Sequence, residues 1–160
     1  MKYYTGVGSR KTPPEIRLLM TKIAKKLSAT HMLRSGGAIG ADQAFEAGAG
    51  SNKKIYVASD ATEAAKTVAA KYHPVWYRLS DFVKKLHGRN AFQVLGDDLA
   101  TPSKFLVCWT PDGCVSHETR ALRTGGTGTA ISIASENGVT VFNLAIVSHR
   151  ERLEKWVDKE

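Results

Sequence analysis

Two kinds of apolar pattern alternate along the chain: short runs typical of strands, and longer segments with apolar residues at helical spacing. Short runs rich in aromatic and β-branched residues predict strands, because such side chains suit a pleated, half-buried surface. These runs lie at residues 2–7, 31–34, 54–58, 104–109 and 139–144. Apolar residues at helical spacing predict helices between them. The helical segments are residues 13–27, 38–49, 61–72, 82–86, 88–96 and 130–137, with a last amphipathic helix after residue 148.

Polar residues stand where several of these helices are expected to begin. Thr12 precedes two prolines and a glutamate, which is typical of an N-cap with proline in the first turn. Asp60, Ser80 and Ser148 precede the helices that follow them in the same way. We therefore expect these four side chains to cap helices.

The alternation of strand and helix predicts an α/β fold. We expect a Rossmann-like arrangement of three layers, with a mainly parallel sheet of about five strands covered by helices on both faces. The run at residues 105–108 is apolar at every position, which is typical of the centre of a parallel sheet. No repeat, linker or low-complexity segment interrupts the 160 residues, so we expect one domain, residues 1–160.

Three loops of small residues are expected at the carboxyl ends of the strands, where ligands bind in such sheets. Glycine lets a phosphate approach the backbone, and the first turn of a helix offers it free N–H groups. The candidate phosphate-binding residues are Gly8, Ser9, Arg10, Ser35, Gly36, Gly37, Gly125, Gly126, Thr127, Gly128 and Thr129. The chain has neither a Walker A loop nor a GxGxxG motif, which disfavours ordinary NAD chemistry.

Charged residues near these loops are candidates for recognition or catalysis. Asp42 and Glu46 are four positions apart, so they share one helix face and could hold ribose hydroxyls or act in acid–base chemistry. The alternative is a solvated helix face. Arg10 is either a phosphate clamp or part of a surface ion pair. Arg89 and Asn90 could face the ligand, and Asn90 could instead be a helix cap.

The histidines and cysteines predict no metal site and no cofactor. The five histidines lack metal-ligand spacing, and His117 with Glu118 is typical of a surface loop. Cys108 and Cys114 match no zinc motif, and we interpret them as a strand residue and a loop thiol. Trp109 either stacks on a base or closes the core.

The formal net charge of +8 favours a polyanionic partner, either nucleotides or nucleic acid. The basic residues are dispersed, which favours solvated helix faces over a nucleic-acid stripe. No apolar run approaches a membrane span, and the N-terminus lacks the features of a signal peptide. We expect no membrane association and a cytoplasmic protein, in the host's cytoplasm if it is viral.

Together these motifs resemble a known superfamily. Residues 5–10, 35–46 and 89–90 resemble the Rossmann-like domain of DNA-processing protein A (Smf), with its GSR strand end, its SG-x-A-x-G-x-D loop and its RNR segment. Residues 124–129 resemble the PGGxGTxxE loop of the "lonely guy" phosphoribohydrolases and lysine-decarboxylase-like proteins. Both belong to the SLOG superfamily, and the resemblance covers roughly residues 1–145. The chain is similar to the stand-alone versions found in phages and bacteria.

The chain departs from both patterns. Ser132 stands where the phosphoribohydrolase motif has its catalytic glutamate, and Thr124 stands where it has proline. Glu46 replaces the usual histidine of the DNA-processing proteins, whose flanking domains are missing. Glu46 is therefore the carboxylate that we expect to take over from the missing glutamate.

The resemblance implies that the chain binds a nucleotide or nucleotide-derived ligand. As an enzyme it would hydrolyse the N-glycosidic bond of a nucleoside 5′-monophosphate, with Glu46 stabilising an oxocarbenium-like state or activating water. Asp42 would hold the ribose and Arg89 the phosphate. The alternatives are a non-enzymatic sensor of a signalling nucleotide such as a cyclic ADP-ribose, and single-stranded DNA binding. The resemblance also implies a homodimer or a higher homo-oligomer.

Overall fold

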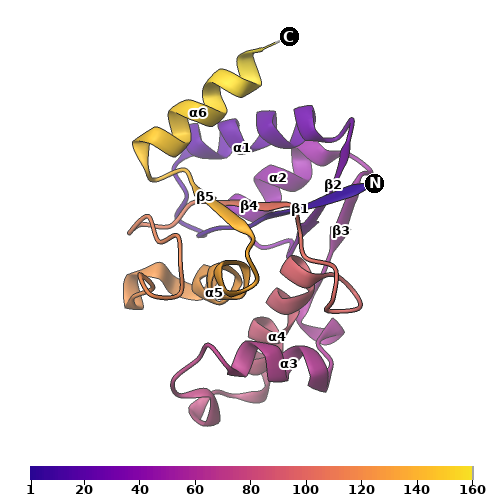
Figure 1. Cartoon of the computed structure of the whole chain (residues 1–160), viewed down its shortest axis with the longest axis vertical. Helices are drawn as coiled ribbons and strands as arrows, with labels where there is room; N and C mark the ends of the chain where they lie inside the picture. The colour runs from indigo at the N-terminus through magenta and orange to yellow at the C-terminus, as the bar shows by residue number, and fades with distance from the viewer. Residues whose placement is uncertain (160) are drawn as a thin grey trace.

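The computed structural model describes residues 1–159 and contains one sheet of five parallel strands (Figure 1). The strands lie in the order β3-β2-β1-β4-β5, and every neighbouring pair is parallel. Their bounds are β1 Lys2–Gly6, β2 His31–Ser35, β3 Lys53–Ile55, β4 Phe105–Cys108 and β5 Thr140–Asn143. The order reverses between β1 and β4, and their carboxyl ends form the switch point where ligands bind in open α/β sheets.

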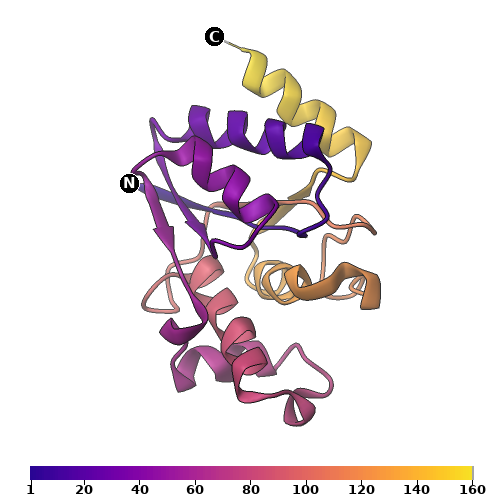
Figure 2. The same ribbon diagram turned by 180° about the vertical axis from the view of Figure 1, so that it is seen from behind.

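Helices cover both faces of the sheet (Figures 1 and 2). One face carries α1 (Pro14–Leu27) and α2 (Ala41–Ala49), with α6 (Val147–Asp158) packed on α1. The other face carries α4 (Asp81–Leu95) and α5 (Gly128–Glu136), with α3 (Glu63–Ala70) packed on α4. Consecutive residues of β4 divide between the two hydrophobic cores, because side chains alternate across a strand. Val107 packs with α1 and α2, whereas Leu106 and Cys108 pack with α4 and α5. The predicted Rossmann-like three-layer fold is confirmed.

Two predicted helix starts are wrong because their polar side chains have other partners. Thr12 Oγ1 donates to the Ser9 carbonyl at 2.6 Å, and α1 begins after Pro13 with no side-chain cap. Asp60 accepts the Val57 N–H within a short 3₁₀ turn, Ala58–Asp60, and Thr62 caps α3. Ser80 caps α4 as expected, accepting the Val83 N–H at 3.2 Å.

The helices predicted at residues 82–86 and 88–96 are one continuous helix, α4. Gly88 lies inside it without breaking it. A Cβ on Gly88 would lie 2.8 Å from Lys66 Cγ, so the glycine lets α4 pack closely on α3. The last helix also begins earlier than predicted: it starts at Val147, and Ile146 instead of Ser148 holds the N-cap position. Two further 3₁₀ turns are Trp76–Arg78 (η2) and Leu122–Thr127 (η3).

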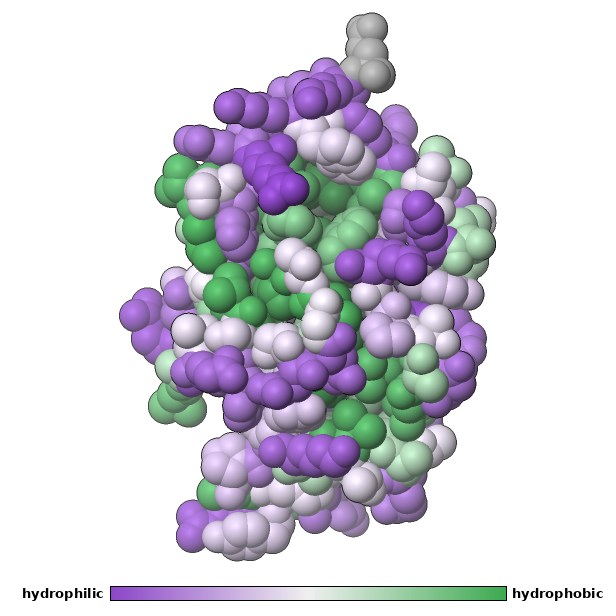
Figure 3. Space-filling view, viewed as in Figure 1, coloured by the Kyte–Doolittle hydropathy of each residue, from purple (hydrophilic) through white to green (hydrophobic). Residues whose placement is uncertain are grey.

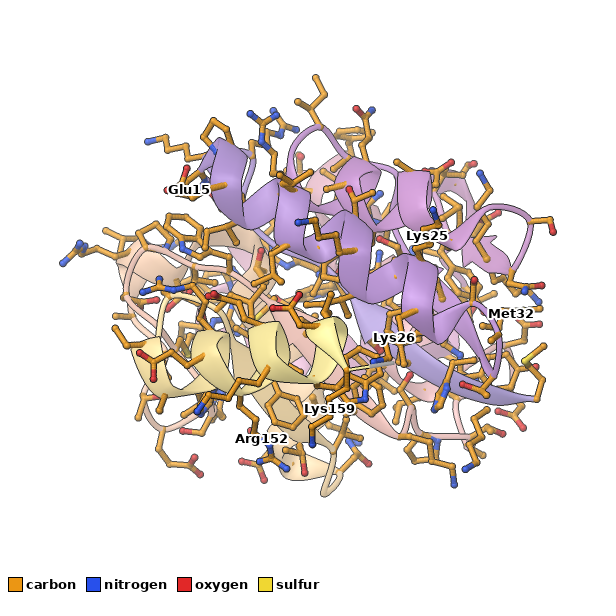
Figure 4. The ribbon with its side chains drawn as sticks, turned by 90° about the horizontal axis from the view of Figure 1, so that it is seen from above. Glu15, Lys25, Lys26, Met32, Arg152 and Lys159 are labelled. Carbon is orange, nitrogen blue, oxygen red and sulfur yellow. The ribbon has the colours of Figure 1, made fainter. Side chains whose placement is uncertain are left out.

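Some of the basic residues bind parts of the chain itself. Figure 4 shows α1 and α6 side by side, with Lys26 of α1 directed at the end of α6. Lys26 Nζ donates to the carbonyls of Trp156 and Lys159, and it lies 4.7 Å from the centre of the Trp156 ring. A cation at a helix C-terminus is favourable because it meets the negative end of the dipole. Within residues 1–159, no helix is both long enough and apolar enough to cross a membrane.

Candidate functional site

Backbone contacts hold the loop after β1 in place. Ser9 N–H donates to the Trp109 carbonyl at 3.1 Å, which joins the loops that follow β1 and β4 at the switch point. A Cβ on Gly8 would lie 2.6 Å from the Cβ of Ala41, so the first turn of α2 packs directly on Gly8. Arg10 follows with an exposed side chain.

The loop after β2 lies against the first one. Gly40 has a φ of +96°, and a Cβ there would lie 2.8 Å from the Arg10 Cα. The Ala41 N–H at the start of α2 points to the Ser9 carbonyl at 3.5 Å. Ser35 Oγ donates to the Gly6 carbonyl at 2.6 Å and is fully buried. The two predicted phosphate loops therefore lie side by side. Several of their hydrogen-bonding groups bond to one another.

Buried and half-buried polar side chains pack on Gly36 at the carboxyl end of β2, and together with Gly36 we call them the Gly36 cluster. It consists of Gly36, Asp42, Arg89 and Gln93. A Cβ on Gly36 would lie 2.5 Å from Gln93 Nε2, 2.9 Å from Asp42 Oδ2 and 3.0 Å from Arg89 Cζ. Arg89 Nη1 donates to the Gly36 carbonyl at 2.9 Å. Both polar atoms of the Gln93 amide are buried without a protein partner in the described residues.

Asp42 is 5% exposed, and its Oδ2 accepts the Ala38 N–H at 3.3 Å. Burial raises the pKa of this carboxyl to about 6, and the Ala38 N–H and the charge of Arg89 act in the opposite direction. Only 5% of the residue is exposed, and its expected contact with ribose hydroxyls stays a prediction.

Glu46 lies one turn further along α2 in a different environment. Its Oε2 pairs with Lys53 Nζ at 2.8 Å, and about a third of each side chain is exposed. A Cβ on Gly37 would lie 4.0 Å from Glu46 Oε1, so this carboxylate stands beside the Gly37 turn. Asn90 is half-buried on α4 and makes no side-chain hydrogen bond within residues 1–159.

The third predicted loop, residues 125–129, edges a pocket of about 770 Å³. We call it the histidine pocket. One wall is formed by residues 71–75 and by His87 of α4, and the other by His117, residues 120–122 and residues 125–126. In Figures 1 and 2 the η3 segment and the chain just before η2 both lie below the sheet, on facing sides. Figure 3 shows an indentation at the same place.

Five basic side chains line this pocket: Lys71, His73, His87, His117 and Arg120. Over the described part of the chain, no carboxylate is among the lining residues. Arg120 also takes part in none of the ion pairs found there. Its charge is half-buried and uncompensated, so the pocket favours an anion.

Only two residues of the third loop are open to the pocket. A Cβ on Gly125 or Gly126 would meet no atom within 4 Å. Gly128 instead makes room for Arg120, because a Cβ there would lie 2.5 Å from Arg120 Nε. Thr129 is fully buried, and Thr127 is half-buried. In the predicted phosphate loop, Gly125 and Gly126 are therefore open to a ligand, whereas Gly128 and Thr129 support Arg120.

Arg120 organises the inner wall of the pocket. Its Nη2 donates to Thr129 Oγ1 at 3.1 Å, and its Nη1 donates to Ser132 Oγ at 3.3 Å and to the Tyr72 carbonyl at 2.9 Å. The same two hydroxyls bind histidines: His87 Nδ1 lies 2.7 Å from Thr129 Oγ1, and His117 Nδ1 lies 2.8 Å from Ser132 Oγ.

The His87 ring is kept neutral at physiological pH. Burial lowers the pKa of His87 to about 4, with the charges of His73, Arg120 and Arg89 acting in the same direction. The rings of His73 and His87 are 5.1 Å apart between centroids.

The sequence did not identify this pocket. His117 was expected in a surface loop, and His73, His87 and Arg120 were assigned no role. Three separate segments supply these side chains, and only the fold brings them together. The one usable signal was the position of His87, two residues before Arg89 on the same helix.

α4 connects the pocket to the Gly36 cluster, because it carries both His87 and Arg89. Trp109 does not face the pocket. It packs against the core formed by α1 and α2, and it lines a separate groove between α1 and α6. Cys114, which was expected to be a loop thiol, is buried with 2% of its surface exposed. No group of three potential metal ligands occurs within residues 1–159.

Comparison with known proteins gives no identification, because no family model, no curated protein and no solved structure matches this chain. The residues of the site therefore carry the functional argument by themselves.

Proposed function

We propose that this chain binds a nucleotide or a nucleotide-derived phosphate ester in the histidine pocket, at the carboxyl edge of the sheet. The observation that carries this proposal is the lining of the pocket, which combines five basic side chains and two open glycines with no carboxylate over the described residues. Its volume of about 770 Å³ suits a small-molecule ligand of nucleotide size.

The lining suggests an orientation for the ligand. The phosphate would lie against the backbone of Gly125 and Gly126, which lead into α5, and near the charge of Arg120. The base would lie along Tyr72 and Leu122, whose aromatic and apolar surfaces face the same pocket.

Calorimetric titration with nucleoside and deoxynucleoside 5′-monophosphates, a cyclic ADP-ribose and a short oligonucleotide tests this proposal. We expect Arg120→Met to weaken nucleotide binding at least about tenfold, because it removes the uncompensated charge. Arg123→Met is the matched control, since Arg123 is exposed and lies outside the pocket lining.

Three results of that titration would separate the alternatives. Tight binding of a cyclic ADP-ribose without turnover would indicate a sensor. Binding of the oligonucleotide alone, lost steeply as salt is raised, would contradict the proposal and favour single-stranded DNA binding. No binding of any nucleotide would also contradict it.

Hydrolysis of the N-glycosidic bond is the second candidate function. It needs a carboxylate, which the pocket lining lacks, and Glu46 beside the Gly37 turn is an accessible one. Free base released from nucleoside monophosphates, measured by chromatography, should then disappear in Glu46→Gln. The variant Glu63→Gln, which removes another exposed carboxylate, should retain it. Base release that survives Glu46→Gln would rule out this role for Glu46.

A further inference from the structure

The tautomer of His73 is fixed by the backbone. The Val75 N–H lies 3.3 Å from His73 Nδ1. A backbone N–H can only donate, so Nδ1 must accept, and the proton of the neutral ring is then on Nε2.

His87 and His117 are oriented in the same way through Arg120. A guanidinium group has no acceptor, so the Thr129 and Ser132 hydroxyls accept from Arg120 and each has one hydrogen left to donate. Within residues 1–159 the only acceptors found for these hydrogens are the Nδ1 atoms of His87 and His117, at 2.7 and 2.8 Å, and we assign the hydrogens to them. With this assignment, the neutral form of each ring also carries its proton on Nε2.

The three Nε2 atoms are free to meet a ligand. In residues 1–159, no protein group forms a hydrogen bond with any of them. None of them is among the side-chain atoms that are buried without a partner, so they retain access to solvent. All three rings line the histidine pocket.

We infer that His73, His87 and His117 form a set of neutral N–H donors for one group that carries only acceptors, the phosphoryl group of the nucleotide, and that Arg120 is the residue that positions two of them. This inference rests on the proposed function and assigns the part of the ligand that the histidines recognise. An ammonium or amino group in the same place would find donors on every side and no acceptor on these rings.

The same arrangement disfavours a metal ion held by these rings. A metal needs the unprotonated nitrogen, and in all three rings that nitrogen is Nδ1, which is already bonded within the protein. Nε2 could bind a metal only after the proton moved and the Nδ1 contacts were lost.

The first measurement is the tautomer itself, in the ligand-free full chain. Two-dimensional ¹H–¹⁵N spectra of histidine-labelled protein at neutral pH distinguish a protonated from an unprotonated ring nitrogen. We expect unprotonated Nδ1 and protonated Nε2 in His73, His87 and His117. In Thr129→Val, which removes the hydroxyl and keeps the shape, His87 alone should lose this preference. Thr129→Ser, which keeps the hydroxyl, should restore it.

The second measurement is the affinity of inorganic pyrophosphate and of a nucleoside 5′-monophosphate for the same variants. Thr129→Val and Ser132→Ala should each weaken both ligands by about three- to tenfold, whereas Thr129→Ser should bind like the unaltered chain. Circular dichroism checks that each variant is folded.

These results separate the inference from the proposed function. Protonated Nδ1 atoms, stoichiometric Zn²⁺ binding by the three histidines, or pyrophosphate affinity unchanged in Thr129→Val would each overturn the inference, even if nucleotides bind. Pyrophosphate binding that follows the tautomers, with no nucleotide bound, would support the inference and contradict the proposed function.

Discussion

The Gly36 cluster and the histidine pocket lie at the same edge of the sheet, and their glycines serve opposite purposes. In the Gly36 cluster and the two loops beside it, a Cβ on Gly8, Gly36 or Gly40 would lie within 3 Å of protein atoms, so these glycines permit close packing. In the histidine pocket, a Cβ on Gly125 or Gly126 would meet nothing. The same residue type thus marks a closed junction in one loop and an open surface in the other.

The polar side chains also differ in exposure: those of the first region are enclosed by protein, and those of the second face an open pocket. The carboxyl of Asp42 and the amide of Gln93 are buried and turned towards neighbouring chain segments. The three histidines and Arg120 bond to the protein on one side and line an open pocket on the other. The comparison supports our proposal that the first region holds the loops in place and the second receives the ligand.

Replacing one glycine by alanine in each region should give the largest difference in stability between the two regions. Gly40→Ala should lower the free energy of unfolding by about 3 kcal/mol, because its positive φ and the nearby Arg10 backbone leave no room for a side chain. Gly126→Ala should change it by less than about 0.5 kcal/mol. Urea unfolding measures both, and equal losses in the two variants would contradict the distinction.

Asp42 should make stability depend on pH in an unusual direction. Its folded pKa of about 6 lies above the usual carboxyl value of 3.8, so between these values the folded chain binds more protons than the unfolded one. Stability should therefore fall as pH rises from about 4 to about 6, by up to about 3 kcal/mol, and then level off.

Urea unfolding across this pH range compares the unaltered chain with Asp42→Asn. The difference in unfolding free energy between the two should grow in favour of Asp42→Asn as pH rises through that window. A constant difference from pH 4 to pH 7 would contradict the raised pKa of the Asp42 carboxyl.

The fold could be predicted because its signals are local. Period-two and helical patterns predicted the five strands, both helical layers and the loop positions. The apolar run at residues 105–108 forms an interior strand between β1 and β5, whereas the central strand is β1. A predicted helix cap was wrong where the polar side chain bonds to another part of the chain, as Thr12 does to the Ser9 carbonyl. The break predicted before Gly88 failed because that glycine packs on α3.

The site could be predicted only in part. Glycine-rich loops can be read from sequence, but whether a glycine faces a helix or an open pocket depends on what packs opposite it. The roles of Thr129 and Ser132 depend on Arg120, which comes from a loop with no pattern of its own. The sequence could not group His73, His87 and His117, because no regular spacing along the chain relates them.

The ion pair of Glu46 and Lys53 should contribute little to stability. Both side chains are about a third exposed, so solvent screens the pair, and Glu46→Gln should cost less than about 1 kcal/mol. A loss of base release in this variant could then be attributed to chemistry rather than to unfolding. A larger loss in urea unfolding would show that Glu46 has a structural role.

Nucleotide affinity should be nearly independent of pH above neutrality. The His87 pKa of about 4 keeps that ring neutral, and Arg120 keeps its charge throughout. Calorimetric titrations from pH 7 to pH 8.5 should therefore differ by less than about threefold. A much steeper loss towards pH 8.5 would indicate that a protonated histidine, rather than a neutral donor, holds the phosphate.

The most direct test of the account is to follow the backbone amides of the ¹⁵N-labelled full chain during titration with a nucleoside 5′-monophosphate. We predict that the largest shift changes occur at Gly125 and Gly126, with smaller changes at Arg120 and His87. The amides of Gly8 and Gly36 should respond least among the candidate glycines, because they are closed by packing. Changes centred on Gly8 and Gly36, or none at Gly125 and Gly126 under saturating nucleotide, would contradict the account.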